Sequence, residues 1–218
     1  MKFLSEYFDR NYEVACELQN NTLIDFRMIE MIQSDKKDSK LVYNWMNKYG
    51  LFQGINNDTR YNISKTFLKL YPDIKLKLQS TNTIEEVFIY LFTSFYKIKQ
   101  RSWLSATSKL LWCVSPNNIV IYDSFVSNSL TVIQSIEQTI LIKKRIGIQP
   151  ELNSVSDISK TASFYMNYQD IVKIIFNNYN KQFFELKNKY SIAYPYDLRI
   201  LDKLLWMMGN PKFNFDTG

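Results

Sequence analysis

Two residues near the middle of the chain, Lys109 and Asp123, have side chains that could work together in covalent chemistry. Lys109 lies near the start of an apolar stretch with helical spacing, and Asp123 lies at the start of the next predicted helix, after a turn at residues 115–118. An uncharged lysine amine attacks electrophilic carbon, and a carboxylate stabilises positive charge that develops beside it. No other part of the sequence combines residue types in a pattern with comparable chemical content.

The complete absence of histidine from the 218 residues narrows the chemistry further. Without an imidazole ring, the chain cannot form a serine or cysteine triad, a histidine-bridged zinc site or a histidine-ligated iron site. Its two cysteines, Cys16 and Cys113, are too few for a four-cysteine metal site, and each lies in an apolar run typical of core residues in a reducing compartment. Catalysis must therefore rely on Lys, Asp, Glu, Tyr, Ser, Thr or Cys, and we expect no metal and no other cofactor.

Positive charge is concentrated in one part of the sequence. The chain has 27 Lys and Arg against 21 Asp and Glu, a formal net charge of +6, but residues 87–122 contain no acidic residue. The cations of this span are Lys97, Lys99, Arg101 and Lys109, and the aromatic residues among them include Tyr96, Trp103 and Trp112. Such a segment suits a nucleic acid, because cations bind phosphates and aromatic rings stack on unpaired bases. The simpler alternative is a solvated turn between two core helices, with the aromatic rings packed inside.

The elements that carry these residues are predicted to be helices. With 5 Gly and 5 Pro in the whole chain, short strands joined by glycine-rich turns are disfavoured. The clearest helix starts with a capping box of Thr83 and Glu86, and its apolar residues fall on one face from 84 to 95. A second helix begins at Asp123, a favoured N-cap residue, and continues to Ile140 before a basic end.

A third helix covers residues 198–208, and Gly209 followed by Pro211 marks its end. Further helices are predicted over residues 3–19, 23–33, 39–49, 60–71, 104–114, 156–166 and 169–189. The expected fold is therefore all-α, with roughly nine or ten helices. We expect one compact domain over residues 1–218, with room for two lobes and a cleft between them.

The sequence carries no targeting signal that we can identify. No segment approaches the ~18 consecutive apolar residues that a membrane span requires, and the first ten residues lack the apolar core of a secretory signal. We therefore expect a cytoplasmic protein that does not bind a membrane, with a monomer as the favoured state.

The segment from about residue 97 to 130 resembles the lysine-to-aspartate stretch of the helix-hairpin-helix DNA glycosylase superfamily, particularly its 8-oxoguanine glycosylase-like branch. The resemblance implies that Lys109 is the catalytic lysine and Asp123 the catalytic aspartate. Residues 199–209 are also similar to a closing helix in compact, divergent members of that group. Two departures stand out, because residues 101–108 lack the glycines of the family's hairpin and the Lys109–Asp123 separation of 14 positions is shorter than usual.

The function implied by the resemblance is a DNA glycosylase, with or without AP lyase activity. Such an enzyme binds duplex DNA, flips a damaged or modified base out of the stack and cleaves its N-glycosidic bond. The residues expected to bind DNA or the flipped base are Lys97, Lys99, Arg101, Ser102, Trp103, Ser105, Thr107, Ser108 and Tyr122, with Trp112 and Trp206 as further candidates for the pocket wall. Base-excision repair and defence against phage with modified DNA are both compatible with this activity.

Two other functions stay open. The missing hairpin glycines favour a noncatalytic DNA-binding or interaction protein on the same fold. A metal-dependent nuclease is a weaker alternative, suggested by Asp73 and by the spacing of Glu185 and Lys187. Each catalytic assignment also has a structural alternative, with Lys109 an exposed helix lysine and Asp123 only a helix cap.

Overall fold

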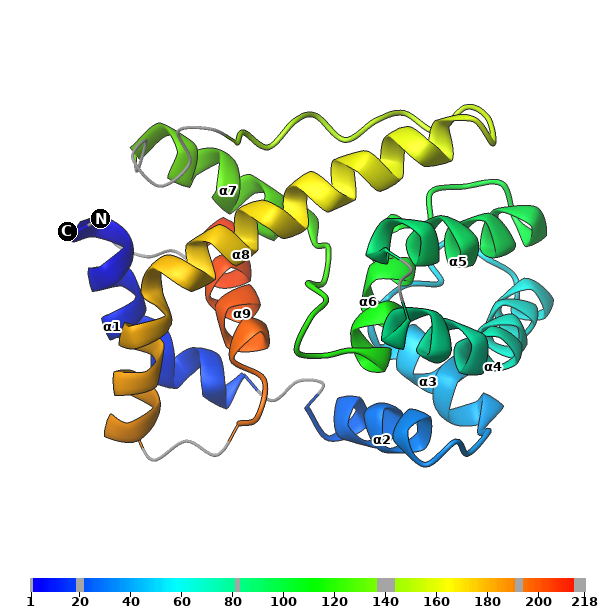
Figure 1. Cartoon of the computed structure of the whole chain (residues 1–218), viewed down its shortest axis with the longest axis horizontal. Coiled ribbons are helices and arrows are strands. Elements are labelled where there is room, and N and C mark those ends of the chain that lie inside the picture. The colour runs from blue at the N-terminus through cyan, green and yellow to red at the C-terminus, as the bar shows by residue number, and fades with distance from the viewer. Residues whose placement is uncertain (1, 19–21, 81–82, 137–143, 191–193, 214–218) are drawn as a thin grey trace. The chain divides into compact units, whose positions relative to one another are not determined.

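Every element in the described part of the chain is a helix. The computed structural model describes residues 2–18, 22–80, 83–136, 144–190 and 194–213. Within these residues lie nine helices (Figure 1): α1 (Lys2–Glu17), α2 (Thr22–Gln33), α3 (Ser39–Lys48), α4 (Asn57–Gln79), α5 (Ile84–Ile98), α6 (Leu104–Val114), α7 (Ser124–Ile136), α8 (Asp157–Lys189) and α9 (Asp197–Gly209). The prediction of an all-α fold is confirmed.

Close contacts divide the chain into two compact units. Unit 1 consists of Met1–Leu18, Val120–Ile148 and Phe164–Gly218, and unit 2 consists of Gln19–Ile119 and Gln149–Ser163. Unit 1 therefore contains α1, α7, α9 and most of α8, whereas unit 2 contains α2 to α6 and the start of α8. This division does not decide whether the two units form a single domain, which stays a prediction.

Two stretches of helix are longer than the sequence predicted. The predicted helices 156–166 and 169–189 form one helix, α8, because no Gly or Pro between them interrupts helical hydrogen bonding. Helix α4 continues through Pro72, where the predicted helix ended one residue earlier. Pro72 removes one backbone donor, but the buried side chains of Tyr71 and Ile74 on either side of it stabilise the continued helix.

The predicted helix starts at Thr83 and Asp123 are confirmed. Thr83 Oγ1 accepts a hydrogen bond from the backbone N–H of Glu86 at 3.2 Å, and the Glu86 carboxylate accepts one from the N–H of Thr83 at 2.8 Å. Asp123 Oδ1 accepts a hydrogen bond from the N–H of Phe125 at 3.0 Å and so caps α7. Parts of two predicted helices, at residue 19 and at residues 137–143, lie outside the described residues.

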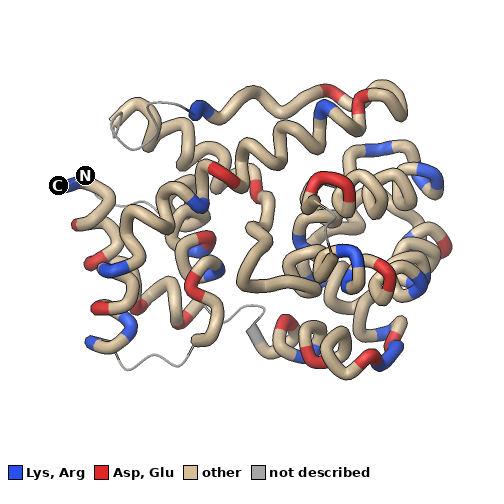
Figure 2. Tube along the Cα trace, in the orientation of Figure 1, with Lys and Arg blue, Asp and Glu red and all other residues tan. Residues whose placement is uncertain are grey.

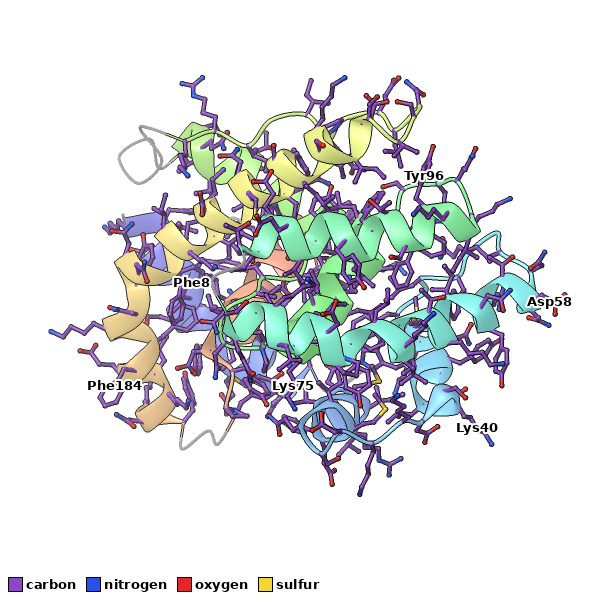
Figure 3. The ribbon with its side chains drawn as sticks, turned by 45° about the vertical axis from the view of Figure 1, so that its right-hand side comes forward. Phe8, Lys40, Asp58, Lys75, Tyr96 and Phe184 are labelled. Atoms are coloured by element: carbon purple, nitrogen blue, oxygen red, sulfur yellow. The ribbon has the colours of Figure 1, made fainter. Side chains whose placement is uncertain are left out.

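Aromatic rings pack between α1 and α8 in unit 1. The ring centroid of Phe8 lies 5.2 Å from that of Tyr179 and 5.4 Å from that of Phe183, in edge-to-face arrangements. Phe184, the next residue along α8, points away from this contact and is 66% exposed (Figure 3). The C-terminal part of α8 therefore buries one face and exposes the other.

Helices α7 and α9 approach each other closely at Gly209. A Cβ atom at this position would overlap the carbonyl oxygen of Phe125 and lie 2.6 Å from Ser129 Oγ. Helix α9 ends at Gly209, one residue after the predicted last residue 208, and Gly209 does not have the positive φ angle of a left-handed helix-ending glycine. What this position requires is the absence of a side chain.

Helix α6 is the central helix of unit 2. It packs against α2, α4 and α5, and its buried residues are Leu104 and all of 106–113. A helix that is surrounded by others buries its polar residues together with its apolar ones. Cys113 lies in this buried run, whereas Cys16 in α1 is half-buried, and neither cysteine forms a disulfide. None of the helices described is long and apolar enough to cross a bilayer.

Candidate functional site

Lys109 is buried inside unit 2, with 4% of its surface exposed. Its amine donates a hydrogen bond to Ser105 Oγ, one turn earlier in α6, at 2.8 Å. The same Nζ atom lies 5.9 Å from the ring centroid of Tyr49, within the range of a cation–π contact. Lysines are almost never this buried unless other groups hold the amine. Lys109 is therefore not the exposed helix lysine that the sequence left open.

A buried carboxylate, Asp25 in α2, lies in the same unit and is 2% exposed. Trp45 Nε1 donates a hydrogen bond to Asp25 Oδ1 at 2.8 Å, and the Tyr49 hydroxyl lies 2.9 Å and 2.8 Å from the two carboxylate oxygens. Trp45 and Tyr49 are four residues apart, so one helical turn brings both side chains to the same carboxylate. Tyr49 thus contacts both Asp25 and Lys109. We call Asp25, Trp45, Tyr49, Ser105 and Lys109 the buried lysine cluster.

Sequence reasoning did not identify Asp25, Trp45 or Tyr49. A signal for Asp25 was present, because it falls at helical spacing with Met28, Ile29 and Ile32, which are all buried. A carboxylate on the apolar side of a helix needs a buried partner, since its desolvation is otherwise costly. The identity of that partner could not be predicted, because α2, α3 and α6 meet only in the tertiary structure.

Asp123 belongs to unit 1, where it caps α7. The neighbouring Tyr122 is buried, and its ring packs edge-on against Phe164 and Tyr168. Burial raises the pKa of Tyr122 above its ordinary value, and the negative charge of Asp123 adds to this effect. Because Lys109 lies in unit 2 and Asp123 in unit 1, their catalytic pairing stays a prediction.

Residues 87–122, the span without acidic residues, have exposed cations at the end of α5 and in the connection to α6. Lys97 and Lys99 are exposed, and Figure 2 shows Lys and Arg, in blue, at the end of α5 and along the connection that follows. Arg101 is half-buried because its Nη1 donates a hydrogen bond to the carbonyl of Gln53 at 2.8 Å and its guanidinium lies 5.2 Å from the Trp103 ring. Lys97 and Lys99 are thus available to an anion, whereas Arg101 is engaged within unit 2.

Several residues predicted to contact DNA are buried. Trp103 is 1% exposed, and its Nε1 donates a hydrogen bond to the carbonyl of Lys99 at 2.9 Å. The side chains of Thr107 and Ser108 are 0% exposed, since they face the neighbours of the central helix α6. These three side chains are buried in this conformation, and their contact with DNA stays a prediction.

The remaining predicted contacts are Ser102 and Ser105, which are both half-buried. Ser105 accepts the hydrogen bond from Lys109, so its role in this structure is to hold the amine. Of the two further pocket candidates, Trp112 is 1% exposed within α6. Trp206 is half-buried in α9, with its ring against Phe125 and Phe213. Both tryptophans therefore pack within their own units.

The residues that suggested a nuclease are engaged in separate ion pairs: Asp73 with Lys77, Glu185 with Lys181, and Lys187 with Asp197. Within the described ranges, no three acidic or cysteine side chains gather closely enough to hold a metal ion. Those ranges also contain no strand of the kind on which such a nuclease is built. These observations do not support the nuclease alternative.

No protein-family model matches the chain, and no curated protein or solved structure is detectably similar to it. A functional assignment therefore depends on the residues themselves and on their geometry within each unit.

Proposed function

We propose that the chain is a DNA glycosylase of the helix-hairpin-helix type, with Lys109 as its nucleophile and Asp123 as the carboxylate that stabilises the transition state. The observation that carries this proposal is the burial of the Lys109 amine, which is bound by Ser105 and lies over the Tyr49 ring. Burying an ammonium costs free energy, and the loss of a proton relieves that cost. A buried lysine is therefore a candidate for nucleophilic chemistry.

The reaction begins when a flipped nucleotide presents its C1′ atom to the neutral amine. Lys109 Nζ bonds to C1′ while the C1′–N bond breaks, and the departing base keeps the electron pair and takes up a proton. The Asp123 carboxylate stabilises the positive charge that develops on the sugar. The nitrogen then loses a proton and the sugar ring opens, which leaves an imine between Nζ and C1′.

The imine accounts for the lyase activity. Loss of a proton from C2′ expels the 3′ phosphate by β-elimination, and water then hydrolyses the imine and regenerates the lysine. If water attacks C1′ instead of the amine, the reaction stops at an abasic site. Lys109 substitution therefore separates the bifunctional route from the monofunctional one.

The distribution of charge between the units supports a DNA-binding role for unit 2. Its segments contain 15 Lys and Arg against 10 Asp and Glu, whereas those of unit 1 contain 12 against 11. Most of the net positive charge of the chain therefore belongs to the unit that contains Lys97, Lys99 and Lys109. Cations near a polyanion add affinity without sequence specificity, as a base-flipping enzyme needs while it searches DNA.

The proposal is tested by borohydride trapping on duplexes that carry 8-oxoguanine, uracil, alkylated bases or the modified cytosines of phage DNA. The wild-type protein is expected to form a covalent adduct on at least one duplex, because borohydride reduces the imine to a stable amine. Lys109→Gln is expected to lose this adduct. The base that supports adduct formation also distinguishes a repair enzyme from a defence enzyme.

A matched control is Lys203 in α9, a second buried lysine in the described part of the chain. It is 8% exposed, and its amine lies 4.8 Å from the ring centroid of Tyr194. Lys203→Gln is expected to keep the adduct, since this lysine has no role in the proposed chemistry. If the wild-type protein forms no adduct and leaves every duplex intact after heat or alkali, the glycosylase proposal is wrong.

A noncatalytic DNA-binding protein is the second candidate. The absence of glycine from residues 101–108 favours it, because the hairpin of the resembled family uses glycines to bring its backbone close to a phosphate. It predicts that the protein retains duplexes in a gel-shift assay without trapping or cutting any of them. Magnesium-dependent cutting that survives Lys109→Gln would instead support the nuclease alternative.

A further inference from the structure

We infer that Asp25 and Tyr49 are positioning residues for the amine of Lys109, an inference that rests on the proposed role of Lys109 as a nucleophile. Asp25 holds the Tyr49 side chain, and Tyr49 in turn holds the amine. The three residues come from α2, from the residue after α3 and from α6, so the arrangement exists only when these helices pack together.

The first link runs from Asp25 to Tyr49. A carboxylate that is 2% exposed must be satisfied by hydrogen bonds, because its hydration is lost. Trp45 supplies one hydrogen bond to Oδ1 at 2.8 Å, and the Tyr49 hydroxyl lies within 2.9 Å of both carboxylate oxygens. A hydroxyl held at both oxygens of a buried carboxylate has little freedom to move. The Tyr49 ring is therefore fixed in orientation by Asp25.

The second link runs from Tyr49 to Lys109. Lys109 Nζ lies 5.9 Å from the centroid of the Tyr49 ring, and Ser105 Oγ accepts a hydrogen bond from it at 2.8 Å. A lysine has four rotatable side-chain bonds, so contacts with two separate segments of the chain restrict where Nζ lies far more than one contact would. Misplacing a reacting group by about 1 Å can slow a reaction on the order of 100-fold.

NMR spectroscopy tests the placement of the Lys109 amine against the Tyr49 ring in the absence of DNA. In protein labelled with ¹³C-lysine, the Lys109 Cε protons are identified by their loss in Lys109→Arg, and the Tyr49 ring current is expected to displace them from the shifts of exposed lysines. Tyr49→Leu should abolish the displacement. Asp25→Asn and Tyr49→Phe should each reduce it, since the ring remains but is no longer held by the carboxylate.

The same variants test the effect on chemistry through the single-turnover rate of borohydride trapping with saturating protein. Asp25→Asn and Tyr49→Phe are each expected to slow trapping by about 10- to 100-fold, with an unchanged dissociation constant for DNA. The double variant should trap no more slowly than the slower single variant, because both substitutions break the same link. Tyr49→Leu should be slower than Tyr49→Phe, which retains the ring.

The matched control is Tyr71→Phe in the same unit. Tyr71 is fully buried and donates one hydrogen bond from its hydroxyl, to the carbonyl of Lys36 at 2.8 Å, so the loss of a buried tyrosine hydroxyl is reproduced away from Lys109. Its trapping rate and Lys109 resonances should match those of the wild-type protein. Thermal unfolding of each variant verifies that it is folded. If Asp25→Asn does not fold, Tyr49→Phe still tests the contact between Asp25 and Tyr49.

Two results would overturn the inference. One is a set of Lys109 resonances that stay unchanged in Asp25→Asn, Tyr49→Phe and Tyr49→Leu. The other is a trapping rate in these variants equal to that of Tyr71→Phe. If the wild-type protein forms no adduct at all, the proposed function fails, while the resonances still decide whether Asp25 and Tyr49 hold the amine.

Discussion

Gly209 in α9 lies directly against the backbone of Phe125 in α7, and no side chain fits between them. The contact is reinforced one turn further along α7, where the Ser129 hydroxyl donates a hydrogen bond to the carbonyl of Leu205 in α9. Phe125 is two residues after Asp123, which caps the same helix. The contact between α7 and α9 therefore fixes the start of α7, and with it the proposed catalytic carboxylate, within unit 1.

The close contact makes Gly209 sensitive to substitution. Gly209→Ala is expected to lower the free energy of unfolding by about 1–3 kcal/mol, because the added methyl group must displace backbone atoms rather than a mobile side chain. Urea denaturation monitored by circular dichroism measures the change. Gly147→Ala is the control, since a Cβ at that position meets nothing within 4 Å. Equal stability of the two variants would show that α7 and α9 do not pack as described.

The capping box at the start of α5 should contribute measurably to stability. Thr83→Ala removes the side-chain acceptor for the N–H of Glu86 and is expected to cost about 1 kcal/mol. Thr93→Ala, inside the same helix, provides a comparison in which the same atoms are deleted without loss of a cap. Thermal unfolding of both variants checks the prediction, which is wrong if Thr83→Ala is no less stable than Thr93→Ala.

Cys16 is expected to react slowly with alkylating agents at neutral pH. Burial raises the pKa of its thiol to about 11, against the smaller opposing effect of the Lys203 ammonium. A raised pKa leaves less thiolate at a given pH, so alkylation at pH 8 should be on the order of 100-fold slower than for an unhindered thiol and should rise with pH up to about 11. Mass spectrometry after timed iodoacetamide treatment measures the rate, and unfolding in urea should remove the difference.

The exposed cations Lys97, in the last turn of α5, and Lys99, just after it, should contribute to DNA affinity in a salt-dependent way. Lys97→Ala and Lys99→Ala are each expected to reduce the slope of log Kobs against log salt concentration by about 1, because each removes one phosphate contact. Fluorescence anisotropy with a labelled duplex at several salt concentrations gives the slope. Lys181→Ala is the control, since this exposed lysine lies on α8 in unit 1. A slope unchanged in all three variants would place the DNA-binding surface elsewhere.

The local features of the chain were predictable from its sequence because they depend on neighbours within a few residues. Apolar spacing along α5, the capping box of Thr83 and Glu86, and the cap at Asp123 all arise from contacts across one helical turn. The lengths of α4 and α8 were underestimated. Pro72 weakens α4 locally, but buried side chains on both sides of it outweigh that loss, and no Gly or Pro interrupts α8.

The candidate site was predictable only in part. The sequence identified Lys109 as a chemically meaningful residue, but it left open whether the side chain was exposed or buried. It contained no link between Lys109 and Asp25, which are 84 positions apart, or between Lys109 and Tyr49. Residues so far apart come together through the packing of α2, α3 and α6, and no pattern of neighbouring residues in the sequence predicts that packing.

By itself, then, the sequence determined the helical class of the fold, most of the helix ends and the absence of imidazole chemistry, because composition and short-range periodicity are properties of the chain alone. The tertiary structure decided which residues share an environment. It buried Lys109 with Asp25 and Tyr49, because α6 is surrounded by other helices of unit 2. It also made a glycine necessary at position 209, because the close approach of α7 leaves no space for a side chain there.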